Sequence, residues 1–234
     1  MTILELAFAC YLYNRLTKFD KDYFEFLSIT KGKPDLLIEK HRAALIKWLN
    51  KWGCRQFAIE YHEMFSNELG RWYADNRALL PKPGKQIWQL SNDELNMLGD
   101  FYESLASLKA SEKKYKRRGG VNVKVGPTGS AKILFAIRPN AVAPWDEPIR
   151  KAKGYNDSKD SYLEFLNDIK EKLIELDHLC KATGMELTSL PRFIDRPGSS
   201  VTKLIDEYNW ITLTKGWTLP EPSKYKKWFE LQSS

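Results

Sequence analysis

The sequence predicts a protein built from α-helices, and three observations point to that class. Apolar residues recur at intervals of three and four over several long stretches, which is the spacing of one face of a helix. Residues that favour helix starts and helix ends bound most of these stretches. Hydrophobic residues at 43% and charged residues at 29% are ordinary values for a soluble globular chain.

The first ninety residues are expected to form one helical region. Leu-Pro-Lys-Pro-Gly-Lys at 80–85 is its clearest loop, and we interpret it as a junction between lobes or as a loop that faces DNA. Gly53 is a plausible C-cap, because glycine adopts the left-handed conformation that often ends a helix. Helical spacing of apolar residues predicts four helices in this region, at about 2–18, 20–27, 34–52 and 56–72.

A second region is expected over residues 91–184, and it begins with a strong helix signal. Ser91 and Glu94 have the spacing of a capping box, in which each side chain binds the other residue's backbone N–H. This helix is predicted to continue through Leu108 and to end in the basic run Lys-Lys-Tyr-Lys-Arg-Arg at 113–118. The run is either a solvated helix end, where cations are stabilised, or a segment that contacts phosphates.

The stretch from Val121 to Tyr155 organises the rest of the chain. It opens with turn-forming residues, since Gly126, Pro127 and Gly129 fall within four positions, and an apolar helix is predicted from Ser130 to about Ile137. Pro139 disfavours helical backbone at the residue before it and so ends that helix. Asp146 is then expected to be the N-cap of another helix, with Glu147 and Pro148 in its first turn.

The remaining residues predict a long helix and a C-terminal segment over 185–234 that packs back on the body. Asp157-Ser158 is expected to cap a helix from about Lys159 to Ala182, and another short helix is predicted from Val201 to about Ile211. Asp206 and Glu207 within it are expected to be exposed or capping residues rather than a catalytic pair. The basic and aromatic residues at 224–229 either touch nucleic acid or dock on the body.

Composition narrows the class of binding partner and the cellular compartment that the sequence predicts. The formal net charge of +7 favours a polyanionic partner, and eight Trp residues are a rich supply of rings for base stacking. Three widely spaced cysteines fit free thiols in a reducing, cytoplasmic setting and exclude a four-cysteine iron–sulfur loop. No apolar run approaches the roughly 18 residues that a membrane span needs. His62-Glu63 lacks the second histidine of a zinc motif, so no metal site is predicted.

The central stretch resembles the core of the helix-hairpin-helix DNA glycosylases, whose pattern is L-P-G-V-G-x-x-T-A, a helix, and then an aspartate entering the next helix. Val125-Gly126 occupies the place of the second hairpin glycine, and Gly129-Ser130 that of the small T-A pair. Asp146 follows Gly126 by twenty residues, about the family's spacing to its catalytic aspartate. Lys124 departs from the pattern, because a glycine stands there in the family. The resemblance implies a two-lobed, all-α glycosylase-like fold with a helix-hairpin-helix motif.

The resemblance also implies the chemistry. Asp146 would stabilise positive charge on the sugar as the base leaves, and Trp145 is a candidate wall of the base pocket, with core packing as the other interpretation. Bifunctional members carry a lysine nucleophile two residues after the second hairpin glycine. Thr128 stands at that position here, so the resemblance implies a monofunctional enzyme that uses water and leaves an abasic site.

The expected partner is double-stranded DNA, with the protein acting as a nucleoid-associated monomer. No cofactor is expected beyond a K⁺ or Na⁺ ion that hairpin carbonyls hold in some relatives. The excised base is damaged or modified, and one hypothesis is a modified cytosine of phage DNA. The alternative is a non-catalytic helix-hairpin-helix module that binds nucleic acid. The expected DNA contacts are Lys124, Gly126, Thr128, Gly129, Ser130 and Lys132 at the hairpin and Lys116, Arg117 and Arg118 before it.

Overall fold

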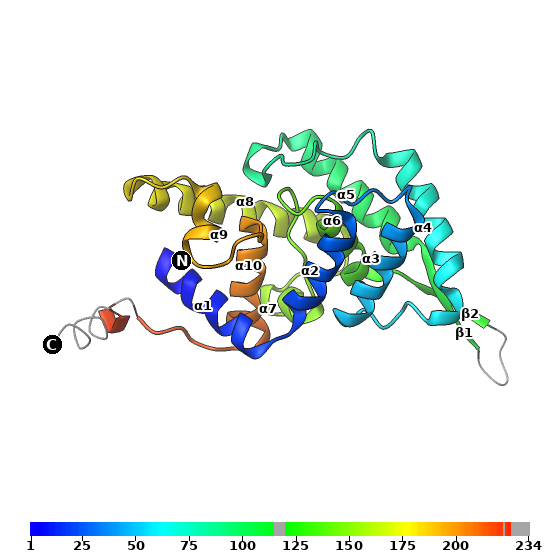
Figure 1. The fold of residues 1–234 in the computed structure, drawn as a ribbon, viewed down its shortest axis with the longest axis horizontal. Coiled ribbons are helices and arrows are strands. Elements are labelled where there is room, and N and C mark those ends of the chain that lie inside the picture. Colours follow the sequence, from blue (N-terminus) through cyan, green and yellow to red (C-terminus); the bar gives the residue numbers. More distant parts are fainter. Residues whose placement is uncertain (115–119, 222, 226–234) are drawn as a thin grey trace.

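Helices form most of the chain in the computed structural model, which describes residues 1–114, 120–221 and 223–225 (Figure 1). The prediction of a largely helical class is thereby confirmed. The α-helices are α1 (Ile3–Leu16), α2 (Phe19–Thr30), α3 (Glu39–Lys51), α4 (His62–Asn76), α5 (Asn92–Ser107), α6 (Gly126–Ile137), α7 (Glu147–Lys153), α8 (Lys159–Ala182), α9 (Leu190–Phe193) and α10 (Val201–Asn209). Short 3₁₀ turns lie at Ile59–Tyr61, Ile87–Gln89 and Leu187–Ser189, and a π-helical turn at Trp210–Thr214 follows α10.

Side-chain caps fix several helix starts where the sequence predicts them. The hydroxyl of Ser91 accepts the backbone N–H of Glu94, whose carboxylate accepts the N–H of Ser91, so the capping box is confirmed. Ser158 caps α8 in a similar way by accepting the N–H of Ser161. Each such cap satisfies a backbone donor that no intrahelical carbonyl can reach.

Over the residues that the structure describes, the prediction that the helix from Ser91 continues through Leu108 to the basic run is wrong. Helix α5 ends at Ser107, and the chain continues as the strand β1 (Lys109–Lys114), which pairs antiparallel with β2 (Gly120–Lys124). Val121 and Val123 are β-branched and favour the extended conformation of β2. The Oγ of Ser111 donates to the backbone carbonyl of Gln56 at 2.6 Å, and this contact holds β1 against the loop before α4.

The pairing of β1 with β2 also corrects the helix-hairpin-helix motif that the sequence predicts. A strand, not a helix, leads into Gly126, so the structure lacks the first helix of a helix-hairpin-helix directly before the turn. Asn122, Val123 and Lys124, which directly precede the turn, lie within this strand. The described part of the chain is therefore mostly helical, with one two-stranded sheet.

Two helix boundaries in the first region differ from the prediction. Helix α3 begins at Glu39, not at Pro34, after a turn that contains Asp35. In that turn the N–H of Leu37 donates to the Asp35 carboxylate at 3.0 Å, which competes with helical hydrogen bonding. The predicted helix at 56–72 is a 3₁₀ turn followed by α4.

One apolar core runs through all three predicted regions. Its buried members extend along the chain from Leu6 in α1 to Ile205 in α10. Helix α6 lies at its centre, because every residue from Gly129 to Ile137 is buried. Helix α10 packs on α1 (Figure 1). This arrangement brings α1, α6 and α10 around one site.

None of the helices in the described part of the chain is long and apolar enough to cross a membrane.

Candidate active site

The turn at the start of α6 has the backbone conformation that selects glycine. Gly126 has φ of 69°, in the left-handed region, while a Cβ built there would meet nothing within 4 Å. Backbone conformation rather than space therefore demands glycine at this position. The turn is anchored on both sides, because Gln56 Nε2 donates to the carbonyl of Val125 at 2.6 Å and Trp145 Nε1 donates to that of Pro127 at 3.4 Å.

These contacts bear on the alkali-metal ion that the resemblance implies. The carbonyl of Val125 already accepts the Gln56 amide, and that of Pro127 accepts both the Trp145 indole and the Ser130 hydroxyl. A cation at the turn would therefore compete with these hydrogen bonds for the same oxygens.

Asp146 is the N-cap of α7, as the sequence predicts. Its backbone is extended, and its Oδ1 accepts the N–H of Ile149 at 3.1 Å. A buried link, 141–145, carries the chain from α6 to this position. Burial raises the pKa of Asp146 above 3.8, while the Ile149 N–H and the cations of Lys132 and Arg150 oppose that rise and favour the carboxylate.

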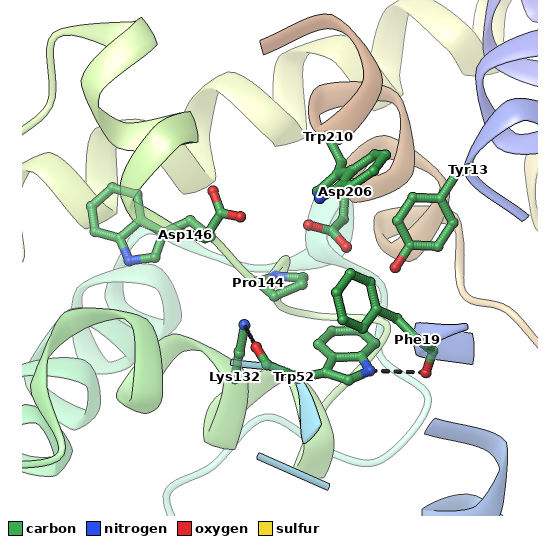
Figure 2. A pocket seen from close by; sticks show the side chains of 9 residues that line it. Tyr13, Phe19, Trp52, Lys132, Pro144, Asp146, Asp206 and Trp210 are labelled. Atoms are coloured by element: carbon green, nitrogen blue, oxygen red, sulfur yellow. Dashed lines mark hydrogen bonds between the residues drawn. The ribbon is translucent and has the colours of Figure 1, made fainter. Parts of the chain in front are cut away.

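The carboxylate of Asp146 lines a pocket (Figure 2). The cavity is about 80 Å³, which is smaller than the roughly 300–1,000 Å³ of most small-molecule sites. Helices α1, α2, α6 and α10, the end of α3 and the link before α7 all contribute to it. The lining residues are Tyr13, Phe19, Trp52, Lys132, Pro144, Trp145, Asp146, Asp206 and Trp210.

Aromatic rings form much of the wall. The rings of Tyr13 and Trp210 meet edge to face with centroids 5.4 Å apart, and Phe19 and Trp52 meet at 6.1 Å. The indole N–H of Trp52 donates to the carbonyl of Phe19 at 2.9 Å, which fixes the ring orientation. Trp210 belongs to the π-helical turn, a distortion that is frequent at functional sites.

Trp145 is both a pocket-lining residue and a core residue. It lines the pocket next to Asp146, and it is fully buried in the core. Its ring packs against those of Tyr102, Tyr162 and Phe165, with centroids 5.1–5.8 Å apart. The guanidinium of Arg150 lies 5.4 Å from its ring centroid.

Asp206, which the sequence does not mark as a site residue, lies in the pocket. Its side chain is 13% exposed, and Figure 2 shows its carboxylate and that of Asp146 directed toward the same space. Burial raises its pKa to about 7, and the negative charge of Asp146 adds to the rise, while Lys203 and Lys132 oppose it. The expectation of an exposed or capping role for Asp206 and Glu207 is wrong, because Glu207 is fully buried.

Helical spacing in the sequence could have predicted on which face of α10 Asp206 and Glu207 lie. In VTKLIDEYN the residues Val201, Leu204 and Ile205 are buried, and Asp206 lies on the flank of that face. The pattern says which residues turn inward, but it does not reveal a cavity there.

Lys132 also lies elsewhere than expected. It is buried, its Nζ donates to the carbonyl of Trp52 at 2.6 Å, and it lies 5.5 Å from the centroid of that ring. Its ammonium group therefore lines the pocket with Asp146 and Asp206 and does not face outward to a DNA backbone (Figure 2).

The other predicted DNA contacts fall into three groups. Lys124 is exposed at the end of β2, and Gly126 and Thr128 are half-buried in the first turn of α6. Gly129 and Ser130 are buried, so only their backbone could take part. Lys116, Arg117 and Arg118 lie outside the described residues.

Behind the pocket, charged side chains form a buried network. Arg196 pairs with Asp20 and with Glu207 Oε1 at 2.6 Å, and Lys203 Nζ donates to the same Oε1 at 2.9 Å. Lys203 also lies 4.2 Å from the ring centroid of Tyr13. Its pKa is raised well above 10.5 because the surrounding acids outweigh the effect of burial. The network connects α2, α10 and the pocket wall.

Within the described residues, no group of three or more His, Cys, Asp or Glu side chains is arranged to hold a metal ion. Comparison of the chain with protein-family models, with curated proteins and with solved structures finds no match.

Proposed function

We propose that this protein is a DNA N-glycosylase that hydrolyses the bond between a damaged or modified base and its deoxyribose and leaves an abasic site. The observation that carries the proposal is the position of Asp146. Its carboxylate caps α7, is partly desolvated and lines an aromatic pocket. A modified cytosine of phage DNA is one substrate that fits this reaction class.

The chemistry requires a carboxylate in such a setting. Departure of the base builds positive charge on the sugar, and a fixed negative charge near C1′ stabilises that transition state. The effect is larger where water is excluded. Asp146 is held by the Ile149 N–H at 3.1 Å, so its oxygen is positioned before the substrate arrives.

The pocket wall supports the binding of an extruded base. An enzyme that acts on a base must take it out of the duplex stack, and planar rings favour stacking on aromatic side chains. Tyr13, Phe19, Trp52 and Trp210 supply such surfaces around the two carboxylates. A base held there would present its glycosidic bond to Asp146.

The turn at 126–130 supports the binding of the DNA backbone. The first turn of α6 presents backbone N–H groups at the positive end of the helix dipole, where a phosphate is stabilised. The contact between the Trp145 indole and the Pro127 carbonyl ties this turn to the residue next to Asp146. A phosphate on the turn and a base in the pocket would thus be held in a fixed relation. Lys124, exposed just before the turn, adds positive charge.

Lys132 favours a second candidate, a bifunctional enzyme. Thr128 stands where the family's amine nucleophile would be, but the Lys132 amine reaches the pocket from one turn further along α6. Attack of this amine on C1′ would form an imine with the opened sugar and lead to strand cleavage by elimination. Hydrolysis is the first proposal, because Thr128 stands at the family's lysine position and the Nζ of Lys132 is already held by the Trp52 carbonyl at 2.6 Å.

The experiment compares the wild type with Asp146→Asn on duplexes that carry different damaged or modified bases, followed by alkali. Asparagine caps a helix as well as aspartate does, so the variant keeps α7 and loses only the charge. We expect alkali-dependent scission by the wild type and a loss of rate of about 10²-fold or more in the variant.

Three other outcomes are informative. Scission without alkali, with a protein–DNA adduct that borohydride traps and Lys132→Gln abolishes, would establish the bifunctional candidate. Salt-sensitive binding that is equal in both proteins, with no base released, would favour the non-catalytic module. Equal base release by both proteins would show that Asp146 is not the catalytic group.

A further inference from the structure

Asp206 differs from Asp146 in the groups that surround its carboxylate. Asp146 accepts a backbone N–H, and a hydrogen bond to the charged form of an acid favours that form. Within the described residues, Asp206 has no side-chain hydrogen bond, and its one ion pair, with Lys203 Nζ, is long at 3.7 Å. Lys203 makes its closer contact with Glu207, at 2.9 Å. The nearby cation is thus engaged elsewhere.

The two carboxylates also act on one another. Both line the same cavity, and in Figure 2 the carboxylates of Asp206 and Asp146 are directed toward the same space. Two partly desolvated acids that face each other do not ionise together readily, because the first negative charge opposes the second. Asp146 is the better stabilised anion. The proton is therefore retained on Asp206.

We propose that Asp206 is the proton donor to the departing base, and that the site consequently acts on uncharged bases, which must be protonated as they leave. The inference rests on the proposed glycosylase function and deepens it by naming the substrate class. A base that is already cationic, such as one alkylated on a ring nitrogen, leaves as a neutral molecule and needs no donor. An uncharged base would leave as an anion unless an acid supplies a proton.

The step balances in atoms and charge. The bond from C1′ to the base nitrogen breaks, and its electron pair stays on the base, which takes the proton of Asp206. The sugar becomes an oxocarbenium ion opposite the Asp146 carboxylate. Water then adds to C1′, and its released proton returns to the Asp206 carboxylate. The products are the free base and an abasic sugar, with both acids in their starting forms.

The charges that face Asp206 set the pH range of this step. Lys203 and Glu207 come from its own helix, Lys132 from α6 and Asp146 from the start of α7. Tyr13 faces the same region from α1. With a pKa of about 7, Asp206 holds its proton below neutrality and loses it above. The rate on an uncharged base is therefore expected to fall as pH rises through about 7.

The test measures single-turnover rates of the wild type, Asp146→Asn, Asp206→Asn and Asp206→Glu. The probes are duplexes with uracil, 8-oxoguanine or 5-hydroxymethylcytosine as uncharged bases and 7-methylguanine as the cationic base. We expect Asp206→Asn to slow the excision of the uncharged base by about 10²-fold or more. The fall of rate with rising pH should disappear with it, and Asp206→Glu should restore part of the rate. Excision of 7-methylguanine, where the wild type performs it, should change by less than about 5-fold.

The outcomes separate the inference from the proposed function. If the wild type releases 7-methylguanine alone, or if Asp206→Asn slows both kinds of base equally, the inference is overturned while the Asp146 proposal stands. If the wild type releases none of the four bases, the proposed function fails on these probes, and the inference is judged on titration alone.

Titration supplies a readout without substrate. Carboxyl ¹³C NMR should show a midpoint for Asp206 near 7 in the wild type and a lower midpoint in Asp146→Asn, where the facing charge is gone. A midpoint near 3.8 in the wild type would overturn the inference. Asparagine is nearly isosteric with the protonated acid, so Asp206→Asn is expected to fold.

Discussion

Glu207 shows how single residues hold the wall of the pocket. It is fully buried, and its Oε1 accepts from both Arg196 and Lys203. Such a buried group of charges adds little net stability when it is complete, because desolvation offsets attraction. Loss of Glu207 leaves two cations, Arg196 and Lys203, to share Asp20 and the long contact to Asp206 in a region of low dielectric. This buried network of charges matters to the protein because it fixes where α10 places Asp206.

Replacement of Glu207 by alanine is therefore expected to lower the free energy of unfolding by about 3–5 kcal/mol. The matched control is Glu68→Ala, which removes an exposed pair with Arg71 on α4 and should cost less than about 1 kcal/mol. Denaturant unfolding of the three proteins checks both values. A cost for Glu207→Ala no larger than that of the control would contradict the buried network.

At the scale of elements, the start of α6 uses two glycines for different reasons. Gly126 has a positive φ and open space around the Cβ position. At Gly129 the limit is space, because a Cβ would lie 2.8 Å from Cγ1 of Val125 and 2.7 Å from Nε2 of Gln56. The second contact involves the amide that holds the Val125 carbonyl. A side chain at position 129 would thus loosen the turn from the loop before α4.

Gly129→Ala is expected to destabilise the protein by about 1–3 kcal/mol, the range of an overpacked core position. It should also weaken DNA binding, because Gln56 must move and release the turn. Thermal unfolding and a binding titration check the two effects. Gly84→Ala is a useful control, since φ there is 85° and nothing lies within 4 Å, so it isolates backbone strain from crowding. Equal binding by wild type and Gly129→Ala would contradict the role given to the turn.

At the scale of the whole molecule, a net charge of +7 favours association with DNA over a distance set by ionic strength. Binding that neutralises phosphates releases counterions, so the logarithm of affinity falls linearly with the logarithm of salt concentration. The slope reports how many phosphates the protein neutralises. It therefore tests the basic residues whose structure lies outside the described ranges.

Replacement of Lys116, Arg117 and Arg118 by serine is expected to reduce that slope by about 0.9 for each phosphate that the variant no longer neutralises. A control with the same change in net charge replaces Lys31, Lys40 and Lys181, which are exposed elsewhere on the molecule. Affinity measured across a range of salt concentrations distinguishes the two variants. Identical slopes for the wild type and the first variant would exclude this segment from the interface.

The features that the sequence predicts correctly depend on neighbours in the chain. The caps at Ser91, Asp146 and Ser158 are of this kind, because an N-cap side chain binds a backbone N–H two or three residues away. The helical class follows from the periodicity of apolar residues for the same reason. The turn at Gly126 is also predicted from local sequence, because glycine tolerates a positive φ.

The features that only the tertiary structure decides depend on contacts between distant segments. The strand β1 forms because β2 pairs with it and Gln56 accepts the Ser111 hydroxyl, and neither partner is visible from the run 109–114 alone. Asp206 and Lys132 become pocket residues because α10 packs on α1 beside α6. By itself the sequence determined the helical class, the caps at Ser91 and Ser158 and the aspartate at the start of α7. The second carboxylate and the cavity between the two arise from packing, since whether a polar side chain faces a void depends on what the other helices leave unfilled.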